Sequence, residues 1–547
     1  MALIHLRSFT AAGLLLGTLF FAASLTPSLV PRPTTVQGVL SGLSFTAGYG
    51  IGLVLQLLWR RLQLPMPAGR PRFWLAAGTG LLCAGLAGLA LWKASGWQNT
   101  LRALMDMPPV ETARPLTIAA VALAVFLALV LLGRLVRITL QGLNRRLARL
   151  LPGPQAAVLA LVLTALLFWS LGNGVLVRGG MRFLDASYRQ YDALFEEASP
   201  QPTDPLKAGG PGSLLDWEGL GRAGREMVAA GPDRTRIAEL TGGPAQEPLR
   251  VYVGLNSADD PQARAALALA EMVRIGAFER GTVVIATPTG TGWIDPESQS
   301  ALEYVLRGDV ATVSVQYSYL ASWIALLADP DYGVETAQAV FAAVYGHWRD
   351  LPRDRRPRLY LHGLSLGALN TDLSHDLLQV ISDPYDGMLL SGPPFSSPGW
   401  RAAVQGRTPG TPAWLPRFRD GSTIRFTAQE NRLGDAAAPW DSFRIIYLQY
   451  ASDAVVFFDP GALWRRPAWL EDPRGPDVSP DVGWIPVVTF LQLGLDMMMA
   501  VQPPTGYGHT YAFPHYVDAW AALTDAPGWT PARLEDLKAR VAAQHGL

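Results

Sequence analysis

The stretch Arg358-Leu-Tyr-Leu-His-Gly-Leu-Ser-Leu-Gly-Ala368 joins a short apolar run to the pattern Gly-x-Ser-x-Gly. The run predicts a buried strand, and Leu366–Ile381 predicts a helix. A serine at such a strand-to-helix junction is typical of a nucleophile elbow, in which the serine is strained and the flanking backbones come close. Glycine is therefore expected at Gly363 and Gly367, and Ser365 is expected to be reactive. The alternative is a glycine-rich turn that merely contains a serine.

Short apolar runs alternate with helical patterns on both sides of this junction. Because this alternation is typical of a mostly parallel sheet with helices on both faces, residues 247–547 are expected to form an α/β domain. The predicted strands are Leu249–Gly254, Gly281–Thr287, Ala311–Tyr317, Arg358–His362, Gly387–Leu390 and Arg444–Gln449, and the predicted helices include Asp260–Phe278, Val334–Trp348 and Leu366–Ile381.

A serine hydroxyl becomes a good nucleophile when a histidine accepts its proton and a carboxylate orients the imidazole. After an elbow of this kind, the acid and then the histidine follow the serine in the chain. We favour His509, which lies in a glycine-rich loop before the predicted helix Tyr516–Leu523. His515, which would open that helix, is the alternative. His375 follows the serine too closely, and His545 lies at the terminus.

The acid of such a site is expected just after a strand, at the carboxyl edge of the sheet. Asp453 follows the predicted strand 444–449 and is the preferred candidate. Asp459 is the alternative, although Asp459-Pro460 is a pair that favours turns. Asp453 could also be an ordinary helix cap, a position that aspartate suits.

Backbone N–H groups are expected to bind the negative charge that develops on the substrate oxygen. One is the N–H of Leu366, at the positive end of the predicted helix. The other should come from the loop Thr287-Pro-Thr-Gly-Thr-Gly-Trp293, where Thr289 or Gly290 is the candidate donor. The same loop could simply turn the chain. It lacks the Gly-Lys-Ser/Thr sequence of a phosphate-binding loop.

The first 178 residues have a different character, with fifteen Lys and Arg but only two acidic side chains. A membrane span needs about 20 mostly apolar residues. Five stretches meet this requirement and predict an all-α transmembrane bundle: Phe9–Val30, Val36–Trp59, Phe73–Trp92, Leu116–Gly133 and Ala156–Val177. The first could instead be a cleaved signal peptide, but Pro31 and Pro33 directly after it favour an uncleaved anchor. Glycines in the second suit close helix packing in lipid.

Basic residues in short loops are retained on the cytoplasmic side of a membrane. They are frequent after the second and fourth predicted spans and sparse or offset by acids after the first and third. The amino terminus is therefore expected inside the cell, and everything after residue 178 outside. Between this module and the α/β domain, residues 179–246 are predicted to form a neck.

A long insertion separates Asp453 from His509. Residues 460–505 are expected to form a cap-like insertion, and Trp484–Val501 is too short and broken to span a bilayer. We interpret that segment as a cap or interfacial helix over the site, although a plain core helix fits equally well.

The overall composition excludes several classes of protein. With 45 basic and 45 acidic side chains the chain carries no net charge, so a polybasic nucleic-acid binder is not expected. A single cysteine, Cys83, excludes a disulfide framework and a Cys-rich zinc site. We expect no metal and no organic cofactor.

Taken together, these motifs resemble the alpha/beta-hydrolase superfamily, and more narrowly a bacterial family of membrane-anchored hydrolases with an N-terminal multispan module. The resemblance rests on Ser24–Arg32, Arg250–Gly254, Pro288–Trp293, Gln316–Tyr319, Gly363–Gly367, Ser391–Pro394, Tyr447–Gln449 with Ser452-Asp453, Gly508-His509 and Tyr516–Trp520. One departure is Leu364, where glutamate is more typical. It leaves the nucleophile intact but puts an identical substrate in doubt.

By this resemblance, Ser365, Asp453 and His509 occupy the positions of a catalytic triad. The implied activity is that of an esterase or lipase-like serine hydrolase at the outer face of the bacterial cytoplasmic membrane, acting on a lipid or acylated substrate. An acyltransferase that uses the same triad is a close alternative. A non-catalytic membrane scaffold or receptor with a hydrolase-like fold is another.

Overall fold

The computed structural model describes residues 10–65, 69–177, 200–319 and 333–545. The chain forms two compact units. The first consists of Met1–Phe183, Phe458–Leu470 and Pro476–Met499, and the second of Leu184–Phe457, Glu471–Gly475 and Ala500–Leu547. Much of the insertion predicted at 460–505 thus belongs to the same unit as the N-terminal helices. The start of the predicted neck, residues 179–199, lies outside the described residues.

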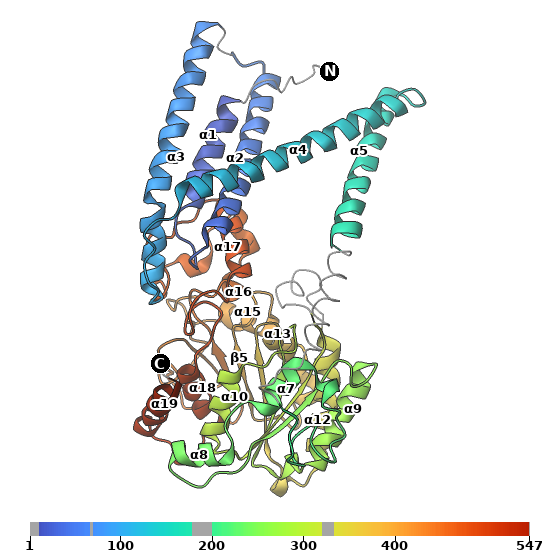
Figure 1. The fold of residues 1–547 in the computed structure, drawn as a ribbon, viewed down its shortest axis with the longest axis vertical. Coiled ribbons are helices and arrows are strands. Elements are labelled where there is room, and N and C mark those ends of the chain that lie inside the picture. The colour runs from blue at the N-terminus through green and yellow to red at the C-terminus, as the bar shows by residue number, and fades with distance from the viewer. Residues whose placement is uncertain (1–9, 66–68, 178–199, 320–332, 546–547) are drawn as a thin grey trace. The chain divides into compact units, whose positions relative to one another are not determined.

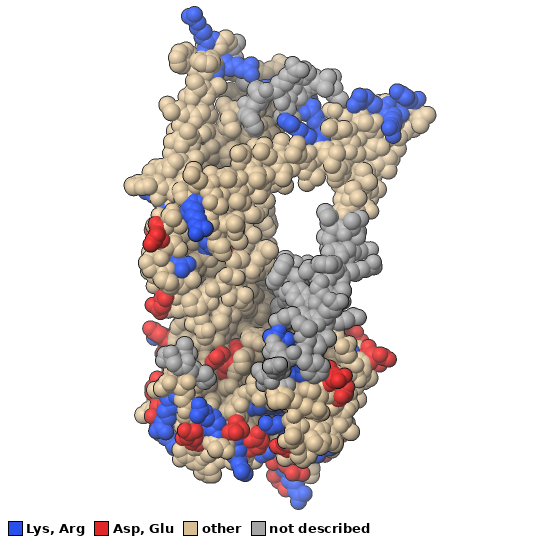
Figure 2. Space-filling model, viewed as in Figure 1, with Lys and Arg blue, Asp and Glu red and all other residues tan. Residues whose placement is uncertain are grey.

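The first unit is built from apolar helices (Figure 1). Four described segments are long and apolar enough to cross a membrane: Thr34–Arg61, Arg70–Leu104, Pro115–Leu147 and Gly153–Asn173. Figure 2 shows little charge on the surface of these helices, apart from Lys and Arg and a small amount of Asp or Glu near helix ends. The helices of this unit are α1 (Ala11–Ser24), α2 (Thr34–Arg61), α3 (Arg70–Leu104), α4 (Pro115–Leu147), α5 (Gly153–Trp169), the π-helix η1 (Ser170–Val177), η5 (Pro460–Leu463), η6 (Ala468–Leu470) and α17 (Val488–Met498).

The first predicted span is shorter than expected. The helix α1 begins after Thr10, whose side chain accepts a hydrogen bond from the Gly13 N–H, and it ends at Ser24 after 14 residues. Prolines at positions 27, 31 and 33 prevent the helix from continuing, because proline lacks the N–H that a helix requires. The apolar run to Val30 therefore forms a helix followed by a buried loop.

Glycines on α2 allow its neighbours to pack closely. A Cβ added at Gly48 would lie 2.4 Å from the Leu16 carbonyl oxygen of α1, and one at Gly52 would lie 2.6 Å from that of Ala12. On another face of α2, a Cβ at Gly42 would lie 2.8 Å from the Ala122 carbonyl oxygen of α4. Pairs of small residues four apart let helix backbones approach in lipid. The expectation of close helix packing through these glycines is met at Gly48 and Gly52.

The second unit is an α/β domain, as predicted. In the described residues its sheet has seven parallel strands in the order β1-β3-β2-β4-β5-β7-β6. All six predicted strands are present with ends shifted by up to two residues, and a short edge strand, β6, was not predicted. The strands are β1 (Leu249–Val253), β2 (Thr282–Thr287), β3 (Val310–Val315), β4 (Arg358–Leu364), β5 (Gly387–Ser391), β6 (Ile424–Thr427) and β7 (Arg444–Leu448).

Helices pack around this sheet (Figure 1). The predicted helix Leu366–Ile381 is in fact two helices, α13 and α14, separated by a turn. The helices are η2 (Glu218–Leu220), α7 (Gly221–Ala229), α8 (Arg234–Thr241), α9 (Pro261–Arg274), η3 (Ala277–Glu279), α10 (Pro296–Val305), α12 (Val334–Asp350), η4 (Arg353–Arg355), α13 (Leu366–Asp372), α14 (Leu377–Val380), α15 (Pro398–Gln405), α16 (Ala454–Phe457), α18 (Phe513–Thr524) and α19 (Pro531–His545).

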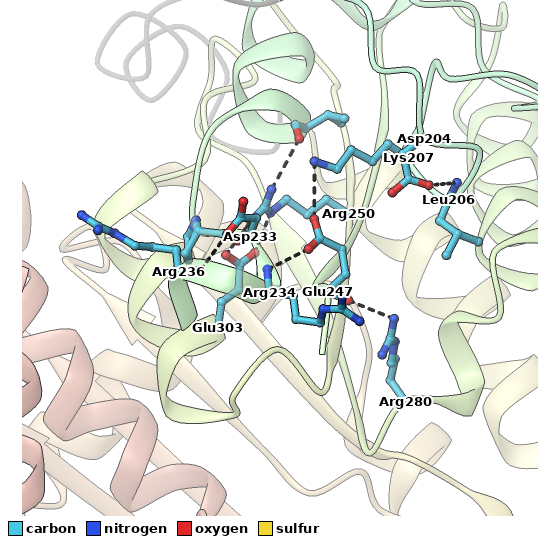
Figure 3. Close-up of polar contacts among 12 residues, drawn as sticks. Asp204, Leu206, Lys207, Asp233, Arg234, Arg236, Glu247, Arg250, Arg280 and Glu303 are labelled. Carbon is cyan, nitrogen blue, oxygen red and sulfur yellow. Dashed lines mark hydrogen bonds and ion pairs between the residues drawn. The ribbon is translucent and has the colours of Figure 1, made fainter. Parts of the chain in front are cut away.

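The described part of the predicted neck is folded into the second unit. Arg250 on β1 forms a buried ion pair with Glu303, 2.6 Å from Nε to Oε1, and also donates to the Pro232 carbonyl between α7 and α8. Figure 3 shows Glu247 nearby, which accepts a hydrogen bond from the Arg234 N–H and pairs with Lys207. These contacts hold residues 204–241 against the sheet, so this part of the chain is not an extended linker.

The packing of α2 against α1 predicts opposite effects for two neighbouring glycines. Gly48→Ala places a methyl group against the α1 backbone and should destabilise the protein by about 1–3 kcal/mol. Gly50→Ala is the matched control, because no heavy atom lies within 4 Å of its added Cβ and alanine favours a helix. Thermal unfolding of the full chain in detergent should show a lower midpoint for the first variant only. Equal midpoints would contradict this packing.

Candidate active site

The turn after β4 has the geometry of a nucleophile elbow. Ser365 has φ 57° and ψ −128°, a conformation that L-residues rarely adopt. A Cβ added at Gly363 would lie 2.4 Å from the backbone of Gly367, and one at Gly367 would lie 2.3 Å from the Thr287 carbonyl oxygen. Both positions therefore require glycine, for the reason expected from the sequence. The turn presents Ser365 at the carboxyl end of the middle strand of the sheet.

Asp453 and His509 meet although 56 residues separate them in the chain. The Nδ1 atom of His509 lies 2.7 Å from Oδ2 of Asp453, and Asp453 is fully buried. The other carboxylate oxygen, Oδ1, accepts a hydrogen bond from the Val455 N–H at 2.8 Å and caps the short helix α16. Asp453 thus binds the imidazole through Oδ2 and caps a helix through Oδ1, so one side chain combines both roles that the sequence suggested.

The second ring nitrogen of His509 is available for chemistry. Its Nε2 atom is buried and has no hydrogen-bond partner among the described residues. A proton on Nδ1, donated to Asp453, leaves a lone pair on Nε2. Buried polar atoms without a partner are rare in folded proteins, and a catalytic role is one reason for them.

The last residue of β5 and the residue after it link Ser365 to His509. The Ser365 N–H donates to the Ser391 carbonyl at 3.0 Å. A Cβ added at the next residue, Gly392, would lie 2.7 Å from Cε1 of His509. The serine backbone and the imidazole ring therefore contact adjacent positions of the chain. Among the described residues no hydrogen bond joins Ser365 to His509, and such contacts commonly tighten only when substrate is bound.

Tyr511 is a member of this cluster that the sequence analysis missed. Its hydroxyl donates to Oδ2 of Asp453 at 2.6 Å, so the tyrosine and His509 share one carboxylate oxygen. Burial, together with the neighbouring Asp453, raises the pKa of Tyr511 and keeps the phenol protonated as a donor. Its ring stacks on Tyr450 at 4.4 Å between centroids. The one available sequence signal was its place two residues after His509.

The alternative acid and base candidates have other contacts. Nδ1 of His515 and the Tyr450 hydroxyl form a hydrogen bond of 2.6 Å, and burial lowers the pKa of His515 to about 4. His375 contacts Ser374 and the Tyr385 hydroxyl. Asp459 caps η5 by accepting the Gly461 N–H at 2.7 Å. His545 lies at the end of α19.

The predicted oxyanion donors differ in their environment. The N–H of Leu366 is at the first position of α13, where a helix has no carbonyl of its own to bind. The loop after β2 adjoins the elbow, as the contact between Gly367 and Thr287 shows. However, the Thr289 N–H donates to the Trp293 carbonyl at 3.0 Å within that loop. This bond occupies the Thr289 group that was expected to bind the oxyanion.

In the described residues, no group of three or more His, Cys, Asp or Glu side chains is arranged to hold a metal ion. The candidate side chains are a strained serine, an imidazole whose Nε2 is buried without a hydrogen-bond partner among the described residues, and a carboxylate that binds the Nδ1 side of the ring. This combination is suited to nucleophilic attack by the serine with the histidine as proton acceptor.

Comparisons with known proteins match two family models to the chain. A family model described as "Alpha/beta-hydrolase family" matches residues 249–537, and one described as "Alpha/beta-hydrolase family N-terminus" matches residues 25–232. No curated protein and no solved structure matches the chain in these comparisons.

A second buried histidine beside the elbow predicts how stability changes with pH. His362 on β4 contacts Ser298 through Nε2 and the Leu389 carbonyl through Nδ1, each at 2.9 Å, and burial lowers its pKa from 6.5 to about 4. Between pH 6.5 and about 4, the unfolded chain therefore binds a proton at this histidine that the folded chain does not. The free energy of unfolding consequently decreases as the pH falls from about 6.5 towards 4. A shift of this size corresponds to about 3 kcal/mol.

The variant His362→Gln should keep a hydrogen-bond donor and an acceptor at this position, and glutamine does not bind a proton in this pH range. Unfolding midpoints measured between pH 7.5 and pH 4.5 should fall less steeply in the variant than in the unmodified protein. The same slope in both would show that His362 contributes nothing to acid sensitivity.

Proposed function

Because the chain belongs to the alpha/beta-hydrolase family, we propose that it is a membrane-anchored serine hydrolase that cleaves ester bonds. Ser365 is the nucleophile, His509 the general base and Asp453 the acid that orients the imidazole. The observation that carries this proposal is the hydrogen bond between His509 Nδ1 and Asp453 Oδ2, with Nε2 left unpartnered near a strained serine.

The proposed reaction proceeds in two steps. Ser365 Oγ attacks the ester carbonyl carbon while His509 Nε2 takes the hydroxyl proton, and the Leu366 N–H stabilises the oxyanion. The ester C–O bond breaks, the alcohol leaves with the proton from His509, and an acyl group remains on Ser365. Water then attacks the acyl group, with His509 again as the base, and the carboxylic acid is released.

The membrane setting supports a lipid or acylated substrate. The first unit supplies four helices that could cross a membrane, so the protein is expected to reside where such substrates are dissolved. Basic residues occur in the last turns of α2 and α4, at Arg60, Arg61, Arg145 and Arg146. By the positive-inside rule these ends are cytoplasmic, which favours a hydrolase unit on the outer face of a bacterial cytoplasmic membrane.

Covalent labelling by a fluorophosphonate tests the nucleophile directly. The unmodified protein should be labelled, Ser365→Ala should not be, and His509→Asn and Asp453→Asn should be labelled at least about a hundredfold more slowly, because the serine then lacks an activated base. His515→Asn serves as the matched histidine control and should be labelled at close to the normal rate. Intact mass identifies the labelled residue.

The same experiment separates the alternatives. A folded protein that no fluorophosphonate labels would favour the non-catalytic scaffold. If labelling occurs, incubation of an activated ester with added alcohol distinguishes the two enzymes. A hydrolase releases free acid, whereas an acyltransferase forms a new ester with the alcohol.

The hydrogen bond from Tyr511 predicts a smaller effect on the same reaction. Tyr511→Phe removes the second donor to Asp453 Oδ2 but keeps the stacked ring, so labelling should slow by about threefold to tenfold. Tyr450→Phe is not equivalent, since the Tyr450 hydroxyl contacts His515 and the Ala512 N–H. An unchanged labelling rate in Tyr511→Phe would show that His509 and the Val455 N–H suffice to hold the carboxylate.

A further inference from the structure

A buried hydrogen bond within the second unit joins two segments of the candidate site. The hydroxyl of Tyr516, near the start of α18, donates to Oδ2 of Asp295 at 2.8 Å. Tyr516 is 0% exposed and Asp295 is 5% exposed. The helices α10 and α18 pack against each other (Figure 1). The bond therefore links α18, which follows the His509 loop, to the start of α10, which follows the loop 287–293.

Both carboxylate oxygens of Asp295 are used. Asp295 is the N-cap of α10, and its Oδ1 accepts the Glu297 N–H at 3.0 Å while its Oδ2 accepts the Tyr516 hydroxyl. Burial raises the pKa of Asp295 to about 7, and the hydrogen bonds from Tyr516 and Glu297 oppose this rise. Burial also raises the pKa of Tyr516, so its phenol stays protonated as a donor. One oxygen is sufficient to cap a helix, so the bond to Tyr516 has another role.

The loop after β2 leads directly to Asp295 and forms a compact turn. The Thr289 N–H donates to the Trp293 carbonyl at 3.0 Å, and the Gly292 N–H donates to the Thr289 carbonyl at 2.9 Å. The Tyr252 hydroxyl, on β1, donates to the Gly292 carbonyl at 2.7 Å. Because a single residue separates Trp293 from Asp295, the turn is held by Tyr252 on one side and by Asp295 at its end.

The same loop lies against the nucleophile elbow. A Cβ added at Gly367 would lie 2.3 Å from the Thr287 carbonyl oxygen and 2.8 Å from the Pro288 carbonyl oxygen. The Thr371 hydroxyl of α13 donates to the Thr287 hydroxyl at 2.9 Å. Gly367 is two residues after the proposed nucleophile, Ser365. A displaced loop would therefore change the contacts of the backbone that presents the serine.

Tyr516 also adjoins the residues that hold the proposed base. Its ring centroid lies 6.3 Å from that of Tyr511, and the Tyr511 hydroxyl donates to Oδ2 of Asp453. The same carboxylate oxygen binds His509. One tyrosine thus contacts the segment of the base through its ring and the end of the loop through its hydroxyl.

We propose that the Tyr516–Asp295 hydrogen bond is a positioning element that holds the loop 287–293 against the nucleophile elbow. This inference rests on the proposed function. Tyr516 and Asp295 act through the loop and do not themselves make or break bonds. The physical basis is that a buried carboxylate oxygen without its donor is destabilised, so the start of α10 moves to find another partner. A displacement of about 1 Å near the reacting atoms can reduce a rate by about a hundredfold.

The test uses the full chain in lipid nanodiscs at pH 8, with the variants Tyr516→Phe and Asp295→Ser and the double variant. Phenylalanine keeps the ring, and serine caps a helix as well as aspartate but is too short to reach Tyr516. Tyr345→Phe is the matched control, because the buried Tyr345 hydroxyl donates to the Asp383 carbonyl before β5, at the opposite edge of the sheet. Amide hydrogen exchange at residues 289–293 and the rate of fluorophosphonate labelling are measured well below the unfolding temperature.

We expect Tyr516→Phe to accelerate exchange at residues 289–293 by about tenfold or more and to slow labelling by about tenfold. Tyr345→Phe should change neither quantity. The double variant should be labelled about as slowly as Tyr516→Phe, because both changes remove the same bond.

Unchanged exchange at residues 289–293 in Tyr516→Phe overturns the inference, and so does accelerated exchange with an unchanged labelling rate. A double variant slowed by the product of the two single effects also contradicts it, since the residues would then act independently. If the unmodified protein is not labelled at all, the proposed function fails, whereas exchange still shows whether the bond holds the loop. Should Tyr516→Phe not fold, Asp295→Ser is judged by the same exchange and labelling measurements.

Discussion

The hydrogen bond between Asp453 and His509 joins the two ends of a long insertion in the chain. After Phe457 the chain leaves the second unit, contributes η5, η6 and α17 to the first unit with Glu471–Gly475 alone belonging to the second, and returns at Ala500. The entropic cost of closing a loop grows only slowly with its length, so such an insertion is compatible with a well-formed site. The 2.7 Å hydrogen bond nevertheless requires both ends of the insertion to be placed accurately. The rest of the site depends on this requirement.

Each end of the insertion is held by its own backbone contacts. At the first end, Asp453 caps α16 and its N–H donates to the Tyr450 carbonyl, so its carboxylate has little freedom to rotate. At the second end, the N–H groups of Gly508 and His509 donate to Ser452 and Ala500. These contacts hold the imidazole in one orientation, which is the preorganisation that the proposed proton transfer requires.

The sequence predicted those features that depend on local signals. The elbow was recognisable because the close approach of two backbones demands Gly363 and Gly367, and the six strands because parallel strands buried on both faces are nearly continuous apolar runs. The edge strand β6 was missed because Ile424-Arg-Phe-Thr427 is too short to show a pattern. The end of α1 at Ser24 follows from the prolines just after it, a local signal that the apolar character of the run concealed. Tyr511, by contrast, depends on its contact with Asp453, which is far away in the chain. No single-sequence pattern reports such contacts.

Asp496 shows why a buried charge can matter for more than stability. In the sequence it appeared only as a residue that interrupts an apolar run, yet it is the partner of Arg32. A hydrophobic pair could stabilise the unit as well, since burying two charges costs about as much as their attraction returns. Leucines, however, pack acceptably in several registers, whereas a carboxylate turned by one residue, about 100° around the helix, would face apolar neighbours. The ion pair therefore selects one rotation of α17 within the first unit.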